Sequence, residues 1–248
     1  MENIYLFIVV LLFVLAISDL IVGVSNDAVN FLNSAFGSRA ASFRTIMIIA
    51  ALGILVGAVF SGGMMEVARK GIFKPGMFYF PEIMLIFLAV MATDILLLDL
   101  FNTFGLPTST TVSIVFELLG AAVGIALIKV SMDTGIGQVS DFINSSNALF
   151  IISGILLSVA VSFFCGWLVQ FFTRILFSFN YKKYLKYFGS VFGGLAITAI
   201  LFFLLLKGAK GATFMTNETV NFIKSNTFSI LLINFLAWSL VLQLLYSL

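Results

Sequence analysis

The sequence predicts an all-α protein that crosses a membrane several times. Of its 248 residues 61% are hydrophobic and only 10% are charged, whereas soluble domains carry about 25% charged residues. Several apolar runs are close to or longer than the roughly 20 residues that span the hydrocarbon of a bilayer. Glycines, prolines and polar residues interrupt two of these runs. We therefore expect a single transmembrane domain over residues 1–248, with broken or re-entrant helices.

The composition excludes several classes of function. The net charge is +2 and no basic patch with interleaved aromatic residues is present, so we expect no nucleic-acid partner. The chain has no histidine, which removes histidine zinc sites and Ser-His triads. The single cysteine, Cys165, lies in an apolar run and is read as packing. The N-terminus lacks the basic region of a signal peptide, and we expect a multi-pass protein of the cell (inner) membrane.

The first apolar run, Ile4 to Val22, is followed by a polar stretch, Gly23 to Ser38. We expect the helix to break here and to restart as a short helix from Asn26 to about Phe36, with Ser25 as its N-cap. On that helix Asn26, Asn30 and Asn33 share one face, and Asp27 lies beside it. A helix broken at membrane depth and lined by such groups is typical of the sites of transporters.

A second interruption is predicted further along. After a span from about Ile46 to Met65, a third span runs from about Glu82 to Phe104 and ends at Gly105 and Pro107. A new helix starts near Thr108 or Ser109 and continues to Val130. Hydroxyl groups and free backbone N–H groups at a helix start favour an anion. We expect Ser109, Thr110 and Thr111 to contact one, the alternative being an N-cap packed among helices.

The rest of the chain predicts three more spans, 148–177, 188–206 and 227 to the end. Pairs of glycines four residues apart, Gly53 with Gly57 and Gly120 with Gly124, predict close approach of neighbouring helices. The two most basic loops, 69–74 and 174–186, leave the orientation open, because three apolar segments separate them.

Acidic residues at apparent membrane depth are a further signal. Asp19, Asp94 and Glu117 lie within apolar runs, where each carboxylate costs about 2.5–3.5 kcal/mol at a helix centre. They are therefore not expected to face lipid. Glu117 shares a helix face with Ser109 and Ser113 and is expected to take a proton or to help hold a cation. For Asp94 and Asp99, pairing with an Arg or Lys of a neighbouring helix is the equal alternative.

Two stretches together resemble the inorganic phosphate transporter (PiT) family. The first supplies Gly23, Asn26, Asp27, Asn30, Gly37 and Ser38, and the second is the run Gly105-Leu-Pro-Thr-Ser-Thr-Thr. The segment Glu66-x-x-Arg69-Lys70-Gly71 also resembles part of the family, although a solvated helix end with an acid–base pair is the favoured interpretation. The chain has Val112 where the family often has histidine after its Ser-Thr-Thr run.

The resemblance implies import of inorganic phosphate by symport with Na⁺ or H⁺, with no other cofactor and no enzymatic activity. With the residue chemistry above, we expect phosphate at Ser109, Thr110, Thr111 and Asn30. We expect the coupling cation at Asn26, Asp27, Asn30 and Glu117, with Asp27 as the candidate ligand of Na⁺. A cation is needed because the Asp27 carboxylate would otherwise repel an anion. The alternatives are asparagines that only join helices, transport of another oxyanion such as sulfate, an intramembrane acid/base enzyme, and a structural membrane subunit.

Members of that family have two inverted halves, each with an Asn-Asp motif and a Ser/Thr-rich break. This chain shows one half, because Asn217-Glu-Thr-Val-Asn221 has no glycine-broken span before it and is read as a chance likeness. The expected partners are inorganic phosphate, Na⁺ or H⁺, the lipid bilayer, and either the C-terminal half of the same transporter or a second copy in a homodimer.

Overall fold

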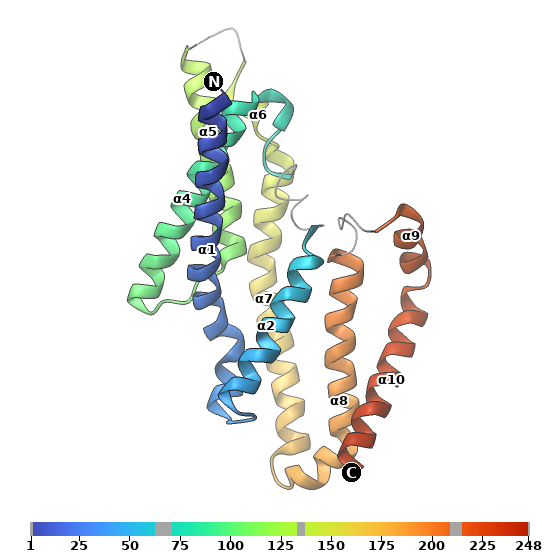
Figure 1. Cartoon of the computed structure of the whole chain (residues 1–248). Helices are drawn as coiled ribbons and strands as arrows, with labels where there is room; N and C mark the ends of the chain where they lie inside the picture. Colours follow the sequence, from blue (N-terminus) through green and yellow to red (C-terminus); the bar gives the residue numbers. More distant parts are fainter. Residues whose placement is uncertain (1, 63–70, 133–136, 209–214, 248) are drawn as a thin grey trace. The chain divides into compact units, whose positions relative to one another are not determined.

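The structure, a computed structural model, describes residues 2–62, 71–132, 137–208 and 215–247 (Figure 1). In these residues the regular structure is helical, apart from one isolated β-bridge. The helices are α1 (Glu2–Gly37), α2 (Phe43–Val59), η1 (Pro75–Met77), α4 (Phe80–Phe104), α5 (Thr110–Met132), α6 (Val139–Phe142), α7 (Ser145–Phe177), α8 (Tyr181–Phe203), the π-helix η2 (Leu204–Gly208), α9 (Asn217–Ser225) and α10 (Thr227–Ser247).

Six of the described helices are long and apolar enough to cross a membrane: the Ile4–Gly37 part of α1, then α4, α5, α7, α8 with the start of η2, and α10. Large hydrophobic side chains stay exposed along them, among them Phe13, Phe31 and Phe163. Exposed apolar surface on this scale marks contact with lipid or with another protein. The prediction of a helical, multi-pass membrane protein is confirmed. Helix α2 is shorter than the expected second span.

Contacts between residues divide the chain into two compact units. Unit 1 is Met1–Leu52 with Val67–Ile155, and unit 2 is Gly53–Glu66 with Leu156–Leu248. Two of the boundaries between the units fall inside helices, one in α2 and one in α7. The prediction of one domain over residues 1–248 stays a prediction.

Helix α1 of unit 1 continues through the stretch where we expected a break. It runs unbroken from Glu2 to Gly37, and the Ser25 hydroxyl donates to the Ile21 carbonyl oxygen at 2.7 Å instead of capping a new helix. Such back-bonding lets a serine stay inside a helix. Gly23 is buried beside α4 and α5, and an added Cβ would be in ordinary van der Waals contact with Leu98 and Thr110, at 3.5 Å. The prediction of a broken first helix is therefore wrong.

The second interruption is confirmed. Helix α4 ends at Phe104, and Gly105 follows in the left-handed conformation, with φ of 66°. The Gly105 and Leu106 N–H groups donate back to the Asn102 and Phe101 carbonyl oxygens at 3.1 and 2.9 Å, as is common at helix C-termini. After Pro107 the chain enters α5, which begins at Thr110. α4 packs against both α1 and α5.

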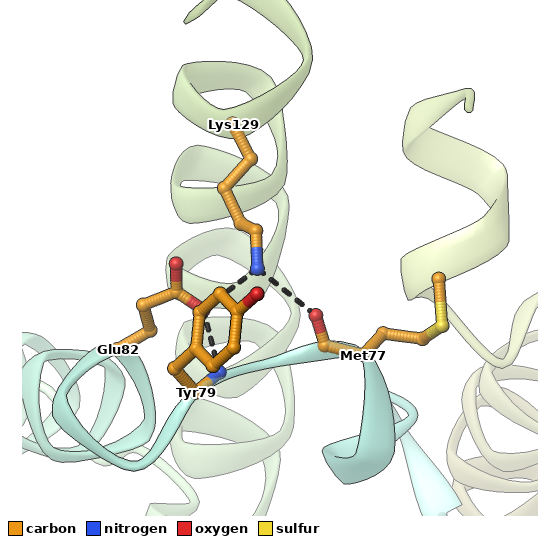
Figure 2. Close-up of polar contacts among 4 residues, drawn as sticks. All are labelled: Met77, Tyr79, Glu82 and Lys129. Carbon is orange, nitrogen blue, oxygen red and sulfur yellow. Dashed lines mark hydrogen bonds and ion pairs between the residues drawn. The ribbon is translucent and has the colours of Figure 1, made fainter. Parts of the chain in front are cut away.

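The opposite ends of α4 and α5 are joined by a clamp (Figure 2). The Lys129 ammonium group, in the last turn of α5, donates to Glu82 at 2.8 Å and to the Met77 carbonyl oxygen at 3.1 Å. It also lies 4.6 Å from the centre of the Tyr79 ring. Glu82 additionally accepts from the Tyr79 N–H group at 2.7 Å. A cation at a helix C-terminus and an anion at a helix N-terminus both agree with the helix dipoles.

Next to this clamp lies the core of unit 1. Phe73, Phe78 and Phe142 pack together with apolar side chains of α4 and α5. Phe73 forms a bridge with Ile143. In α5 the small buried residues are Ala122 and Ala126. Gly120 and Gly124 have no described residue close enough to meet an added Cβ, nor have Gly53 and Gly57, so those predicted helix contacts are absent from the described part of the chain.

Unit 2 is built on α8 and α10, which lie side by side in Figure 1. Three glycines of α8 bring the helices together. An added Cβ at Gly189 would lie 3.2 Å from the Tyr246 ring, and at Gly193 and Gly194 it would overlap Leu242 and Ser239. The Ser190 hydroxyl donates to Gln243 Oε1 at 2.8 Å. Close packing through small residues is a usual way of joining membrane helices.

Candidate functional site

Asn26 connects α1 to the interruption between α4 and α5. Its amide group donates to Asn102 Oδ1 at 2.8 Å and to the Leu106 carbonyl oxygen at 3.2 Å, and its Oδ1 accepts from the Thr108 N–H group at 3.0 Å. Asn102 in turn donates to the Val22 carbonyl oxygen at 3.1 Å. Asn26 is only 5% exposed, and both of its N–H donors are used. We call these contacts the Asn26 latch.

The next residue, Asp27, meets the start of α5. Thr110 Oγ1 donates to Asp27 Oδ2 at 3.1 Å. The latch and this bond hold the first turn of α5 against α1, although 83 positions separate Thr110 from Asp27. The Asp27 carboxylate of α1 thus lies next to the hydroxyl-rich start of α5. The two interrupted regions of the sequence do meet, even though only one of them is a break in the helix.

The start of α5 leaves backbone donors free. Thr108 donates to Asn26 and the Ser113 N–H group donates to Ser109. For the N–H groups from Ser109 to Val112, the described part of the chain offers no acceptor. The Ser109 and Thr111 side chains are exposed. Free N–H groups at the positive end of a helix dipole are suited to an anion.

Asn30 lies in a different groove from the start of α5. This groove has a volume of about 600 Å³ and lies beside the interruption. Its lining is rich in amides: Ser25, Asn26, Val29, Asn30, Asn33, Asn102, Gly105, Leu106 and Pro107. The Thr110 hydroxyl thus bonds to Asp27, whereas among the described residues Asn30 forms no hydrogen bond with Ser109, Thr110 or Thr111.

Glu117 belongs to a second groove of unit 1. This α4–α5 groove has a volume of about 540 Å³ and is lined by Ala89, Thr93, Leu97, Thr108, Val112, Ser113, Phe116, Glu117, Gly120 and Ala121. Ser113, 8% exposed, donates its hydroxyl to Glu117 Oε1 at 2.8 Å. Thr108 joins this groove to the interruption. Of the four residues predicted to hold a cation, Asn26 is used in the latch, Asp27 faces Thr110, and Asn30 and Glu117 lie in separate grooves.

Two other acids of unit 1, Asp19 and Asp94, lie close to Glu117. Asp94 is 1% exposed, and its carboxyl group acts on both Asp19 and Glu117. Among the described residues no cation approaches these three carboxyl groups, so the alternative of an Arg or Lys partner for Asp94 is not found. Two unit charges 4 Å apart repel by about 4 kcal/mol at an effective dielectric constant of 20. Three ionised carboxylates here would destabilise the fold.

Sequence reasoning did not foresee the role of Asn102 or the meeting of Asp19 with Asp94. The available signals were the position of Asn102 just before the predicted break, and the acids at membrane depth on separate helices. The segment Glu66 to Lys70 lies outside the described residues. In the part of the chain that is described, no three His, Cys, Asp or Glu side chains are placed to hold a metal ion.

Together the fold and these contacts define a helical membrane protein whose polar residues are gathered at an interrupted helix pair. A family model for the phosphate transporter family matches residues 23–238, and the chain belongs to this family. Comparison with curated protein sequences gives no match.

Among solved structures the chain is similar to one described as "The sodium-dependent phosphate transporter". The TM-score is 0.68 at 20% sequence identity, over 94% of this chain and 55% of that one. At this identity the likeness establishes the fold. The chain spans about half the length of that transporter. The resemblance to the family is thus confirmed.

Proposed function

We propose that this chain carries inorganic phosphate across the cell membrane by symport with a cation, Na⁺ or H⁺, and that it does so as a transporter and not as an enzyme. The observation that carries the proposal is the contact between Thr110 and Asp27. It joins a helix start with free N–H groups and hydroxyls to a carboxylate at the same point of the fold. Membership of the phosphate transporter family supports the choice of substrate.

The chemistry of the two groups fits an anion with a companion cation. Phosphate presents several acceptor oxygens, and the N–H groups of Ser109 to Val112, with the Ser109 and Thr111 hydroxyls, supply donors without a described partner. The Asp27 carboxylate would repel the anion on its own. A hard cation beside Asp27 removes that repulsion, and oxygen ligands such as carboxylate and hydroxyl suit Na⁺.

The rest of the site is proposed to come from a second set of helices. The chain spans about half of the similar transporter, and both grooves beside the interruption are open in unit 1. The C-terminal half of the same transporter is the first choice of partner, and a second copy in a homodimer is the other. Either would enclose the exposed Ser109, Thr111 and Asn30 side chains.

The test is uptake of radiolabelled phosphate into proteoliposomes. We expect Asp27→Asn, and separately the pair Ser109→Ala with Thr110→Ala, to reduce uptake to background while the protein still inserts into the membrane. Asp99→Asn is the matched control, because Asp99 is an exposed acid on α4. Uptake that persists in both site variants would remove the assignment. Competition by unlabelled sulfate separates phosphate from other oxyanions, and a Na⁺ titration at fixed pH separates Na⁺ from H⁺ coupling.

A further inference from the structure

Three helices of unit 1 each bring one carboxyl group to the same place: Asp19 from α1, Asp94 from α4 and Glu117 from α5. We call these residues the carboxyl cluster. Asp94 is its centre, since it is 1% exposed and its carboxyl group acts on both other groups. In each side chain one buried oxygen has no hydrogen-bond partner among the described residues: Asp19 Oδ1, Asp94 Oδ1 and Glu117 Oε2.

Unpaired buried oxygens are rare in folded proteins and call for a partner that the described residues do not supply, such as a proton, a water molecule or an ion. Ionised carboxylates are acceptors only, so they cannot bond to one another. A proton on one of them creates the missing donor and removes a repulsion at the same time. Carboxyl groups that share a site therefore retain protons.

The surroundings favour protons as the ligand. The charged groups that act on Glu117 are Asp94 and Asp19, and no Lys or Arg of the described chain is among them. On the same helix Ser113 donates to Glu117, and both side chains line the α4–α5 groove. Asp94 is fully enclosed, whereas Glu117 is at the wall of the groove.

We propose that Asp19, Asp94 and Glu117 form a proton-binding site, in which Glu117 exchanges protons with water in the α4–α5 groove and passes them to Asp94. Each step is a proton transfer from water or one carboxyl group to a neighbouring carboxylate. The site is separate from the contact between Asp27 and Thr110. Its role in driving transport rests on the proposed function. Helix α5 carries both Thr110 and Glu117, so protonation of Glu117 is linked to the anion site through one rigid helix.

Infrared spectroscopy of the purified full chain in lipid at neutral pH tests the site directly. We expect a carbonyl stretching band of protonated carboxyl groups that shifts in D₂O. The band should weaken in Asp94→Asn and in Glu117→Gln, and stay unchanged in Asp99→Asn. Glu117 is only half-buried, so its variant keeps the test open if Asp94→Asn does not fold.

Absence of the band, or the same band in both variants, overturns the proposal. Loss of the band on adding Na⁺ at constant pH also overturns it, because the cluster would then bind the metal cation.

Phosphate uptake as a function of external pH supplies a second readout. Binding of one driving proton changes uptake by up to about tenfold per pH unit. We expect Glu117→Gln to flatten this dependence while Asp99→Asn keeps it, and the comparison cancels the titration of phosphate itself. Full pH dependence in Glu117→Gln contradicts the driving role. If the unmodified chain takes up no phosphate, the proposed function fails, whereas the infrared result still decides the carboxyl cluster.

Discussion

The two units hold their helices together by different means. In unit 1, α1, α4 and α5 are joined by the Asn26 latch, the bond between Thr110 and Asp27, and the Lys129 clamp. In unit 2, α8 and α10 are joined by glycines that let the helices approach closely, with one bond from Ser190 to Gln243. The two units thus join their membrane helices in different ways, unit 1 through polar contacts between side chains and unit 2 through close approach of the helix backbones.

Removal of the Asn26 latch is expected to cause the largest loss of stability, and it tests the role of polar contacts in unit 1. Asn26→Leu deletes three hydrogen bonds and leaves the Thr108 N–H group and the Leu106 carbonyl oxygen without their partner. We expect a loss of roughly 3–5 kcal/mol in the free energy of unfolding, measured by thermal or denaturant unfolding in detergent. Asn33→Leu, on the same helix, is the control. An equal loss in both variants would show that the hydrogen bonds of Asn26 contribute no particular stability to unit 1.

Overpacking unit 2 gives the next effect. In Gly194→Leu the added Cβ would overlap Ser239 and lie 3.2 Å from the Phe235 carbonyl oxygen, and we expect a loss of about 2–3 kcal/mol. Gly154→Leu is the control, because no described residue lies close to Gly154. The same unfolding measurement applies. A Gly194 variant as stable as the Gly154 variant would contradict close packing as the basis of unit 2.

The clamp is expected to contribute less, since Lys129 and Glu82 keep 12% and 22% of their side-chain surface exposed. Lys129→Met leaves Glu82 without its cation, and we expect a loss of about 1–2 kcal/mol. The double variant Lys129→Met with Glu82→Gln should recover part of the loss. Without such recovery, the ammonium group acts through the Tyr79 ring and the Met77 carbonyl oxygen and not through Glu82.

The smallest effect is expected for the hydrogen bond between Ser190 of α8 and Gln243 of α10. Ser190→Ala removes the donor to Gln243, and we expect a loss of about 1 kcal/mol. The double variant with Gln243→Leu should be no less stable than Ser190→Ala. A loss as large as that of Asn26→Leu would remove the contrast between the units.

The sequence predicts the helices and the interruption at Gly105, because a glycine followed two positions later by a proline commonly ends a helix. It does not predict that α1 is continuous, since Gly23 and Ser25 fit two roles equally: a helix break, or a close contact with a back-bonded hydroxyl. Helical spacing predicts that Asn26 and Asp27 lie on a helix, but it does not say which other helix they contact. The hydrogen bonds of Asn26 with Asn102 and Thr108, and of Asp27 with Thr110, depend on how distant segments pack together. The position of Asp94 at the centre of three acids depends on it in the same way.

The Asn26 latch has a consequence for biosynthesis. Its partners Leu106 and Thr108 follow Asn26 by 80 and 82 positions. At about 5–20 residues per second, the ribosome needs roughly 4–16 s to supply them. During that time α1 is already synthesised, but the Asn26 amide and the Asp27 carboxylate do not yet have their hydrogen-bond partners. The nascent first helix must therefore remain beside water or the insertion machinery until the α4–α5 hairpin emerges and docks.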